Sequence, residues 1–203
     1  MALIKTSRPD PARASAAAPA LDALVAQLAS PVAAERRAAV RALDAHPDGI
    51  APLCARLAAE PAPSVREAML AALVRRAAPA AVTALLPLLR DGSPAQRNAA
   101  LEALALMPDL VAPHVAALLR DRDSDVRIFT VNLLGVLPHP EAARWLVEAL
   151  DDAHPNVCAA AVDGLAEIGD ARALPALAAL PARFPEDGFL AFAVQLACQR
   201  IAQ

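Results

Sequence analysis

Hydrophobic positions along this chain recur in a pattern about 31 residues long. Six anchor positions follow one another at intervals of 30 or 31 residues, and a leucine lies seven residues after each of them. The anchors are Arg36, Arg66, Arg97, Arg127, Cys158 and Phe189, and the leucines are Leu43, Leu73, Leu104, Leu134, Leu165 and Leu196. Anchor and leucine share one face of a helix with a 3.6-residue period. Because so short a repeat cannot bury its apolar face alone, the pattern predicts stacked repeats with one continuous core.

Helix signals divide each repeat into two helices. Pro63, Pro94 and Pro155 lie three residues before an anchor, and the capping residues Ser93 and Asp123 lie four residues before one. A capping residue followed by proline is typical of a helix start, so a second helix is predicted to begin close to each anchor. The first helices are predicted to begin eighteen residues before the anchors, at Asp48, Pro79, Asp109 and Pro140. The sequence therefore predicts an all-α fold of about six helical hairpins.

The composition agrees with a helical protein that does not enter a membrane. Hydrophobic residues make up 57% of the 203 residues and aromatic residues 2%, and much of the apolar content is alanine, the best intrinsic helix former. Charged residues or prolines interrupt every apolar run well short of the roughly 20 residues that a spanning helix needs. Met1 to Ile4 is followed by polar residues, not by the apolar stretch of a signal peptide. We therefore expect a cytoplasmic protein without membrane association.

The chain lacks the motifs of common catalytic and metal-binding sites. It contains no HExxH, no paired CxxC, no GxSxG and no phosphate-binding glycine loop. Cys54, Cys158 and Cys198 do not have metal-ligand spacing and are expected to be reduced, buried thiols. With a formal net charge of -3 and basic residues spread over all repeats, the chain is a poor candidate for nucleic-acid binding. We expect a non-enzymatic protein with no cofactor and no metal.

An acidic column accompanies the anchors. Glu60, Asp91, Asp121 and Asp152 each lie six residues before an anchor, near the predicted loop between the two helices of a repeat. In a stacked array these carboxylates can accept hydrogen bonds from loop amides and from the anchor arginines of their own repeat or the next one. Because such a ladder spreads its charges along the array and does not converge them on one point, we interpret the column as structural.

The fourth and fifth repeats carry a family resemblance. The matching residues are Asp121, Val126, Arg127, Leu134 and Gly135 in one repeat, and Asp152, Val157, Leu165, Gly169 and Asp170 in the next. In these residues the chain resembles the short HEAT-like repeats first grouped with the phycobilisome lyases. The resemblance implies a right-handed α-solenoid over residues 19–203. It says little about activity, because the consensus is a packing code.

In that family the second helices line the concave side of the solenoid, so the positions one and five residues after the anchors are predicted to line a groove. The candidate groove residues are Arg37, Arg41, Glu67, Asn98, Glu102, Ile128, Asn132 and Asp163. This mixed surface is basic at its N-terminal end and suits a protein or peptide partner. An ordinary solvated face is the alternative for any single residue.

Two functions follow from these expectations. The first is an interaction scaffold or adaptor that holds another protein through the groove, within a bacterial signalling or assembly complex. The alternative is a lyase-like or chaperone-like subunit that acts on a cofactor-bearing, bilin-type protein, because phycobilin lyase subunits are the nearest enzymes by resemblance. The sequence leaves the oligomeric state open.

The two ends of the chain depart from the repeat pattern. Residues 1–18 are rich in Ala, Pro, Ser and Arg, without a helical apolar stripe, and are predicted to form a disordered tail. Its apolar start, Ala2 to Ile4, followed by Lys5 and Arg8, is alternatively a docking peptide for a partner. In the last repeat, Phe189 and Phe192 are predicted to cap the core, as atypical terminal repeats do.

Overall fold

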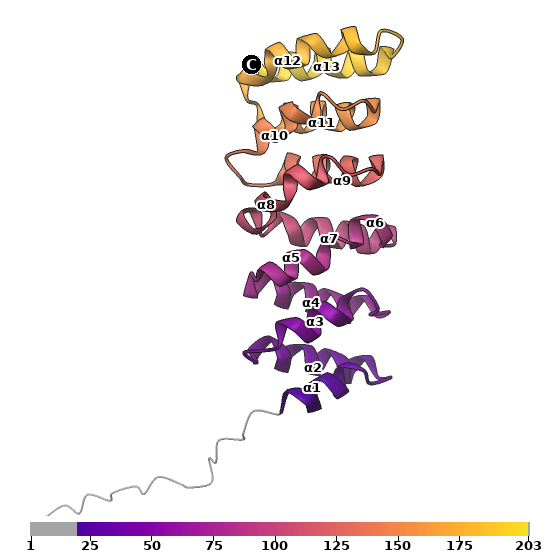
Figure 1. The fold of residues 1–203 in the computed structure, drawn as a ribbon, viewed down its shortest axis with the longest axis vertical. Helices are drawn as coiled ribbons and strands as arrows, with labels where there is room; N and C mark the ends of the chain where they lie inside the picture. The colour runs from indigo at the N-terminus through magenta and orange to yellow at the C-terminus, as the bar shows by residue number, and fades with distance from the viewer. Residues whose placement is uncertain (1–19, 203) are drawn as a thin grey trace, which may run out of the picture.

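The computed structural model of the protein describes residues 20–202, and every regular element in that range is helical. Figure 1 shows the helices as successive layers of one elongated stack. The first helices of the hairpins are α1 (Leu21–Leu28), α3 (Ile50–Leu57), α5 (Pro79–Leu85) followed by α6 (Leu88–Asp91), α8 (Pro108–Leu118), α10 (Ala142–Ala149) and α12 (Leu174–Ala179). The second helices are α2 (Ala33–Ala45), α4 (Pro63–Arg76), α7 (Pro94–Ala105), α9 (Ser124–Val136), α11 (Pro155–Ile168) and α13 (Gly188–Ile201). Short 3-10 helices, Ala171–Ala173 and Leu180–Arg183, flank α12.

The predicted right-handed α-solenoid of helical hairpins is confirmed. Each second helix packs against the second helix of the next hairpin, so that α2, α4, α7, α9, α11 and α13 form one continuous layer. No helix among residues 20–202 is long and apolar enough to cross a membrane. The predicted tail, residues 1–18, lies outside the described residues.

The helix starts follow the local signals in the sequence. Pro63, Pro94 and Pro155 are the first residues of α4, α7 and α11. The Ser93 hydroxyl accepts a hydrogen bond from the Gln96 amide, while the Gln96 side chain accepts one from the Ser93 amide, which completes a capping box. These contacts satisfy amides that the helix itself leaves without a partner. Helices α4, α7 and α11 therefore begin at the prolines that the sequence marks.

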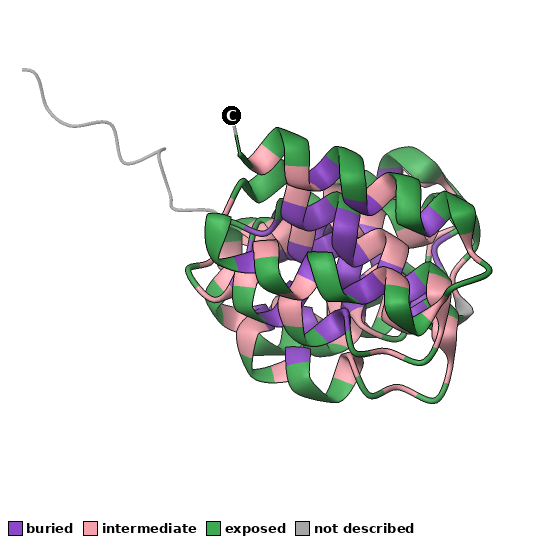
Figure 2. Ribbon diagram, turned by 90° about the horizontal axis from the view of Figure 1, so that it is seen from above, coloured by how far each residue is buried: buried purple, intermediate pink, exposed green. Residues whose placement is uncertain are grey.

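The core is a continuous column of leucines between the two layers. Leu43, Leu73, Leu104, Leu134 and Leu165 have no exposed surface, and each belongs to a different second helix. Figure 2 shows the buried residues gathered along the interior of the stack, with exposed residues outside. Burying one such leucine stabilises a fold by roughly 1.5–3 kcal/mol.

The last repeat departs from the predicted register. Leu196 is 55% exposed and Phe189 is 75% exposed, while Leu190 and Val194 are buried. The loop before α13 is longer than in other repeats, and Asp187 caps the helix so that it starts at Gly188. A shift of one residue turns a helix by about 100°, which moves the predicted core positions to the surface.

The prediction that the phenylalanines of the last repeat cap the core was therefore wrong. Phe192 is 62% exposed and Phe189 is 75% exposed. The smaller residues Leu190 and Val194 close the core at this end of the stack. Trp145 on α10 is 8% exposed and stacks on the His139 ring with a centroid distance of 4.7 Å.

Helices α9 and α11 approach each other closely because two glycines face each other. A Cβ atom on Gly164 would lie 3.3 Å from the Gly135 Cα atom and 3.1 Å from a Leu146 methyl group. Side chains larger than hydrogen would push these helices apart.

Candidate functional site

Two surfaces carry the candidate functional residues: the acidic ladder along the loops and the exposed face of the second helices. The clearest rung of the ladder joins Arg36 to Glu60. The guanidinium donates two hydrogen bonds to the carboxylate, at 2.9 and 2.7 Å, and both residues are buried. The third nitrogen of the Arg36 guanidinium donates to the Ser30 carbonyl at 2.8 Å. Burial alone would raise the pKa of the Glu60 carboxyl, but bonds from Arg36 and the Ala62 amide outweigh it, and the pKa is lowered.

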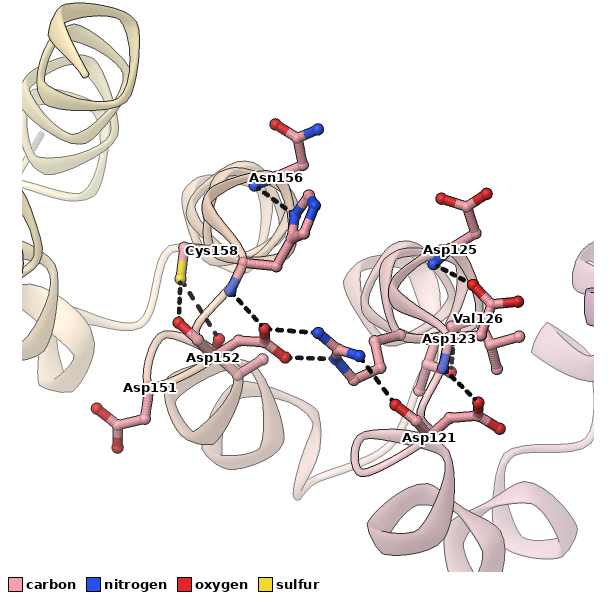
Figure 3. Close-up of polar contacts among 12 residues, drawn as sticks. Asp121, Asp123, Asp125, Val126, Asp151, Asp152, Asn156 and Cys158 are labelled. Carbon is pink, nitrogen blue, oxygen red and sulfur yellow. Dashed lines mark hydrogen bonds and ion pairs between the residues drawn. The ribbon is translucent and has the colours of Figure 1, made fainter. Parts of the chain in front are cut away.

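A second rung repeats this geometry three repeats further along the chain. Arg127 donates to the two carboxylate oxygens of Asp152 at 2.6 and 2.9 Å, and to the Asp121 carbonyl at 2.9 Å. Figure 3 shows Asp152 and Asp121 on opposite sides of this guanidinium. Burial opposes ionisation of Asp152, but the bonds from Arg127 and the His154 amide outweigh it and lower its pKa.

The direction of the rungs corrects the sequence prediction. Each carboxylate in these two rungs pairs with the arginine of the preceding repeat, not with that of its own or the next one. The arginine of the same repeat binds the backbone instead, as Arg66 does at the Glu60 carbonyl over 2.8 Å. Because the Glu60 carboxylate already accepts from the amide two residues on, at Ala62, it points toward the preceding layer.

In one rung the anchor arginine lies over an aromatic ring, and a different arginine pairs with the carboxylate. Phe129 occupies a position that holds alanine in other repeats, and the Arg97 guanidinium lies over its ring at 4.7 Å. Arg90, from the end of α6, pairs with Asp121 in its place. The hydrogen bond from the Asp123 amide, and then the one from Arg90, lower the pKa of Asp121. The side chain of Asp91, the remaining member of the column, is not described.

At the fifth anchor a cysteine and a distant arginine share the role of one arginine. The Cys158 thiol is buried and donates to the Leu150 and Asp152 carbonyls, both at 3.3 Å. Arg183, from the next hairpin, donates to the carbonyls of Leu150, Asp151 and Asp152. Burial raises the pKa of the Cys158 thiol, so the neutral donor form is favoured. Figure 3 shows this thiol directed at the loop carbonyls.

The ladder is thus a structural device. The described rungs direct their charged groups at each other and at backbone groups of adjacent loops. Within residues 20–202, no group of three or more His, Cys, Asp or Glu side chains is placed to hold a metal ion.

The exposed face of the second helices contains two adjoining hollows. The first lies between α4 and α7, has a volume of about 370 Å³, and is lined by Leu70, Val74 and Leu106 with Glu67 and Glu102 at its walls. The second lies between α7 and α9 and has a volume of about 440 Å³. Glu102 and Leu106 line both, so the two hollows form one surface, which we call the second-helix groove.

The floor of the second hollow is apolar. Leu101, Leu106, Leu133 and Val136 line it, and Asn132 contributes a polar edge. Leu106, the C-cap of α7, is 69% exposed, and Val136, the last residue of α9, is 70% exposed. Large apolar side chains exposed side by side in a hollow are typical of an interaction surface.

A third hollow lies at the C-terminal end, between α11 and α13. It has a volume of about 670 Å³ and is lined by Phe189, Phe192 and Leu196 together with Asp163. The register shift in α13 creates it, because that shift turns these three side chains out of the core.

The structure brings half of the predicted groove residues to these hollows. Glu67, Glu102 and Asn132 line the second-helix groove, and Asp163 lines the C-terminal hollow. Arg37, Arg41 and Asn98 are exposed on the same layer but line none of the three hollows. Ile128, the apolar member of the predicted groove residues, is half-buried and packs against the core.

Leu106 and Val136 were missed by the sequence prediction. Both lie nine residues after an anchor, where other repeats carry Ala45, Arg75 and Glu167. Two large apolar residues in an otherwise small or charged column would have marked this surface.

Comparison with known proteins identifies the repeat type. The family model described as HEAT repeats matches residues 21–105 and 111–187. No curated protein matches the chain. The resemblance found in the sequence is therefore confirmed at the level of the repeat.

Solved structures show likeness in fold alone. A designed armadillo repeat protein in complex with the peptide (KR)4 is 22% identical, with 89% of this chain and 99% of that chain covered and a TM-score of 0.45. Human deoxyhypusine hydroxylase in complex with glycerol is 18% identical, with 88% and 83% covered and a TM-score of 0.44. The complex of CpcE and CpcF of phycocyanin lyase from Nostoc sp. PCC7120 is 25% identical, with 89% and 81% covered and a TM-score of 0.38.

Proposed function

The chain belongs to the HEAT repeat family, and from this premise we propose that it is a non-enzymatic scaffold that holds a partner protein in its second-helix groove. The exposed pair of Leu106 and Val136, side by side in one apolar hollow, carries the proposal. Neither side chain contributes to the buried core, so selection for folding alone gives no reason for a large apolar residue at either position.

The walls of the groove suit a peptide segment with apolar and basic side chains. Glu67 and Glu102 border the apolar floor, and neither has an ion-pair partner among the described residues. Apolar contacts at the floor would supply binding energy, while the carboxylates would select the charge and set the register of the partner.

Affinity capture with matched variants tests the proposal. The full chain and its Leu106→Glu and Val136→Glu variants are used as bait in an extract of the native host, and retained proteins are identified by mass spectrometry. Ala116→Glu, an exposed position on α8, is the control for added charge. We expect one specific protein that the wild type and the control retain and that both groove variants lose.

Two outcomes would contradict the scaffold. Retention of the same proteins by all four baits would remove the groove from consideration. Visible absorbance from a chromophore that co-purifies with the chain would instead favour the lyase-like or chaperone-like subunit. Circular dichroism of each variant shows whether its helices remain intact.

A further inference from the structure

The exposed face of the second helices presents charges in a fixed order along the stack, beginning beside the second-helix groove and continuing into it. Arg41 lies on α2, Glu67 on α4 and Glu102 on α7, and these helices are consecutive neighbours in one layer. Beyond Glu102 comes the apolar hollow of Leu106 and Val136. None of these three charged side chains has an ion-pair partner among residues 20–202. The exposed face of the second helices therefore reads positive, negative, negative, apolar from α2 toward α9, and all but the first of these belong to the second-helix groove.

The sequence ahead of α1 contains the complementary order. Ile4 is apolar, Lys5 and Arg8 are positive, and Asp10 is negative. Read backward from Asp10, the segment presents negative, positive, positive and apolar side chains. A chain that enters from α1 and runs toward α9 would place each of them opposite its complement.

The spacing of the two series also agrees. Neighbouring helix axes lie about 8–10 Å apart. Three residues of polyproline II chain span about 9 Å and complete one turn, so side chains three residues apart lie on the same side. Lys5 and Arg8 are three residues apart, as Glu102 and Glu67 are one helix apart. Asp10 follows after two more residues, and Arg41 lies on the next helix.

We infer that residues 3–10 of this chain bind its own second-helix groove, with Ile4 in the hollow between α7 and α9. Lys5 then pairs with Glu102, Arg8 with Glu67, and Asp10 with Arg41. The ten residues from Asp10 to Ala20 reach up to about 33 Å when extended, which exceeds the one-helix step from α2 to α1. The connection is therefore long enough.

This inference rests on the proposed function, because the same groove would hold the partner. A partner must then displace residues 3–10, so the segment lowers the apparent affinity of the groove and rejects weak ligands. An isolated exposed ion pair contributes little to binding, so the Ile4 contact and the pairs together hold a segment that a stronger ligand can still replace.

Photo-crosslinking in the full chain tests the arrangement. A benzophenone amino acid replaces Ile4, and crosslinked peptides are identified by mass spectrometry. We expect crosslinks to peptides that contain Leu106 or Val136. Crosslinks to the α13 hollow or to the first-helix layer, or none above background, would overturn the inference. In an equal mixture of isotope-labelled and unlabelled chains, mixed-label crosslinks would show a second copy as the host and would also overturn it.

A charge exchange tests the register. Arg8→Glu should lower the crosslink yield several-fold, and the additional change Glu67→Arg should restore it. Arg13→Glu, the same change five residues further on, is the matched control and should leave the yield unchanged. Equal losses from Arg8→Glu and Arg13→Glu, or no restoration by Glu67→Arg, would overturn the pairing.

The outcomes separate this inference from the proposed function. Ile4→Asp should increase retention of the captured partner if residues 3–10 compete for the groove. If Ile4→Asp leaves retention unchanged while Val136→Glu still abolishes it, the inference fails and the scaffold stands. If Val136→Glu abolishes the crosslink but no partner is lost, the segment binds and the scaffold fails.

Discussion

The rungs at Arg36 and at Cys158 meet the same requirement with different atoms. At Arg36 one guanidinium binds both the backbone of its own loop and the carboxylate of the next repeat. At Cys158 a neutral thiol binds the loop carbonyls, and Arg183 supplies the charged donors from a later hairpin. In both rungs the loop carbonyls accept hydrogen bonds from side chains, although the residue at the anchor differs. The constant requirement is therefore a donor for these carbonyls, not an arginine at the anchor.

The core is also filled by different helix positions at the two ends of the stack. In the second helices from α2 to α11 the leucine column fills the core, while in α13 Leu190 and Val194 do so and Leu196 faces solvent. The C-terminal repeat thus satisfies the core by a different set of positions, and exposes an apolar stripe as a result.

The largest effect is expected from breaking the buried rung. Arg36→Met leaves the Glu60 carboxylate buried without its arginine, which should cost about 3–5 kcal/mol in the free energy of unfolding. Urea denaturation followed by circular dichroism measures the loss. The double variant Arg36→Met, Glu60→Leu removes both charges and should recover most of it. A single variant as stable as the wild type would show that the rung does not hold the first two repeats together.

Substitutions in α13 test the corrected register. Leu190→Ala should lower the free energy of unfolding by about 2–5 kcal/mol, since it opens a cavity in the core. Leu196→Ala, a change of the same size at an exposed position, should stay within about 0.5 kcal/mol. The opposite ranking in urea denaturation would restore the register that the sequence pattern suggests.

Cys158 and Arg183 bind the same loop carbonyls, so substitutions at the two positions should have coupled effects on stability. Cys158→Arg places a second guanidinium at carbonyls that Arg183 already binds, and should destabilise the fold by about 1–3 kcal/mol. Adding Arg183→Ala should return part of that loss, with a coupling energy of about 0.5–3 kcal/mol in a double-mutant cycle. Strictly additive changes would mean that the two side chains do not share one role.

Lowering the pH should reduce the stability of the fold gradually. The loss for any one carboxylate should be smaller than the effects of the substitutions above. The pKa values of Glu60, Asp121 and Asp152 are lowered in the folded state. Their contribution is therefore complete above the ordinary carboxyl pKa of about 4 and is lost as the pH falls through the lowered values. Melting temperatures measured across this range should fall less for Arg36→Met, Glu60→Leu than for the wild type. Parallel curves would contradict the assignment of the loss to the ladder.

Much of the fold was predictable from the sequence, and less of the site. Pro94 and Ser93 identify a helix start through contacts that span only a few residues. Glu67, Glu102 and Asn132 could be placed on the exposed face of the second helices, because that face follows from the repeat periodicity. The hollows could not be predicted from the sequence, since their shape depends on how far apart neighbouring helices lie.

The sequence by itself determined the hairpin repeat, its helix starts and the buried leucines from Leu43 to Leu165, because helix signals and a 3.6-residue period act locally. Only the tertiary structure decided which arginine pairs with which carboxylate, how Cys158 and Arg183 divide one role, and that α13 turns its phenylalanines outward. The pairings of Arg36 and Arg183 depend on contacts between residues 24 and 31 positions apart. Their physical reason is that stacking fixes the distances between layers, and no single repeat contains that information.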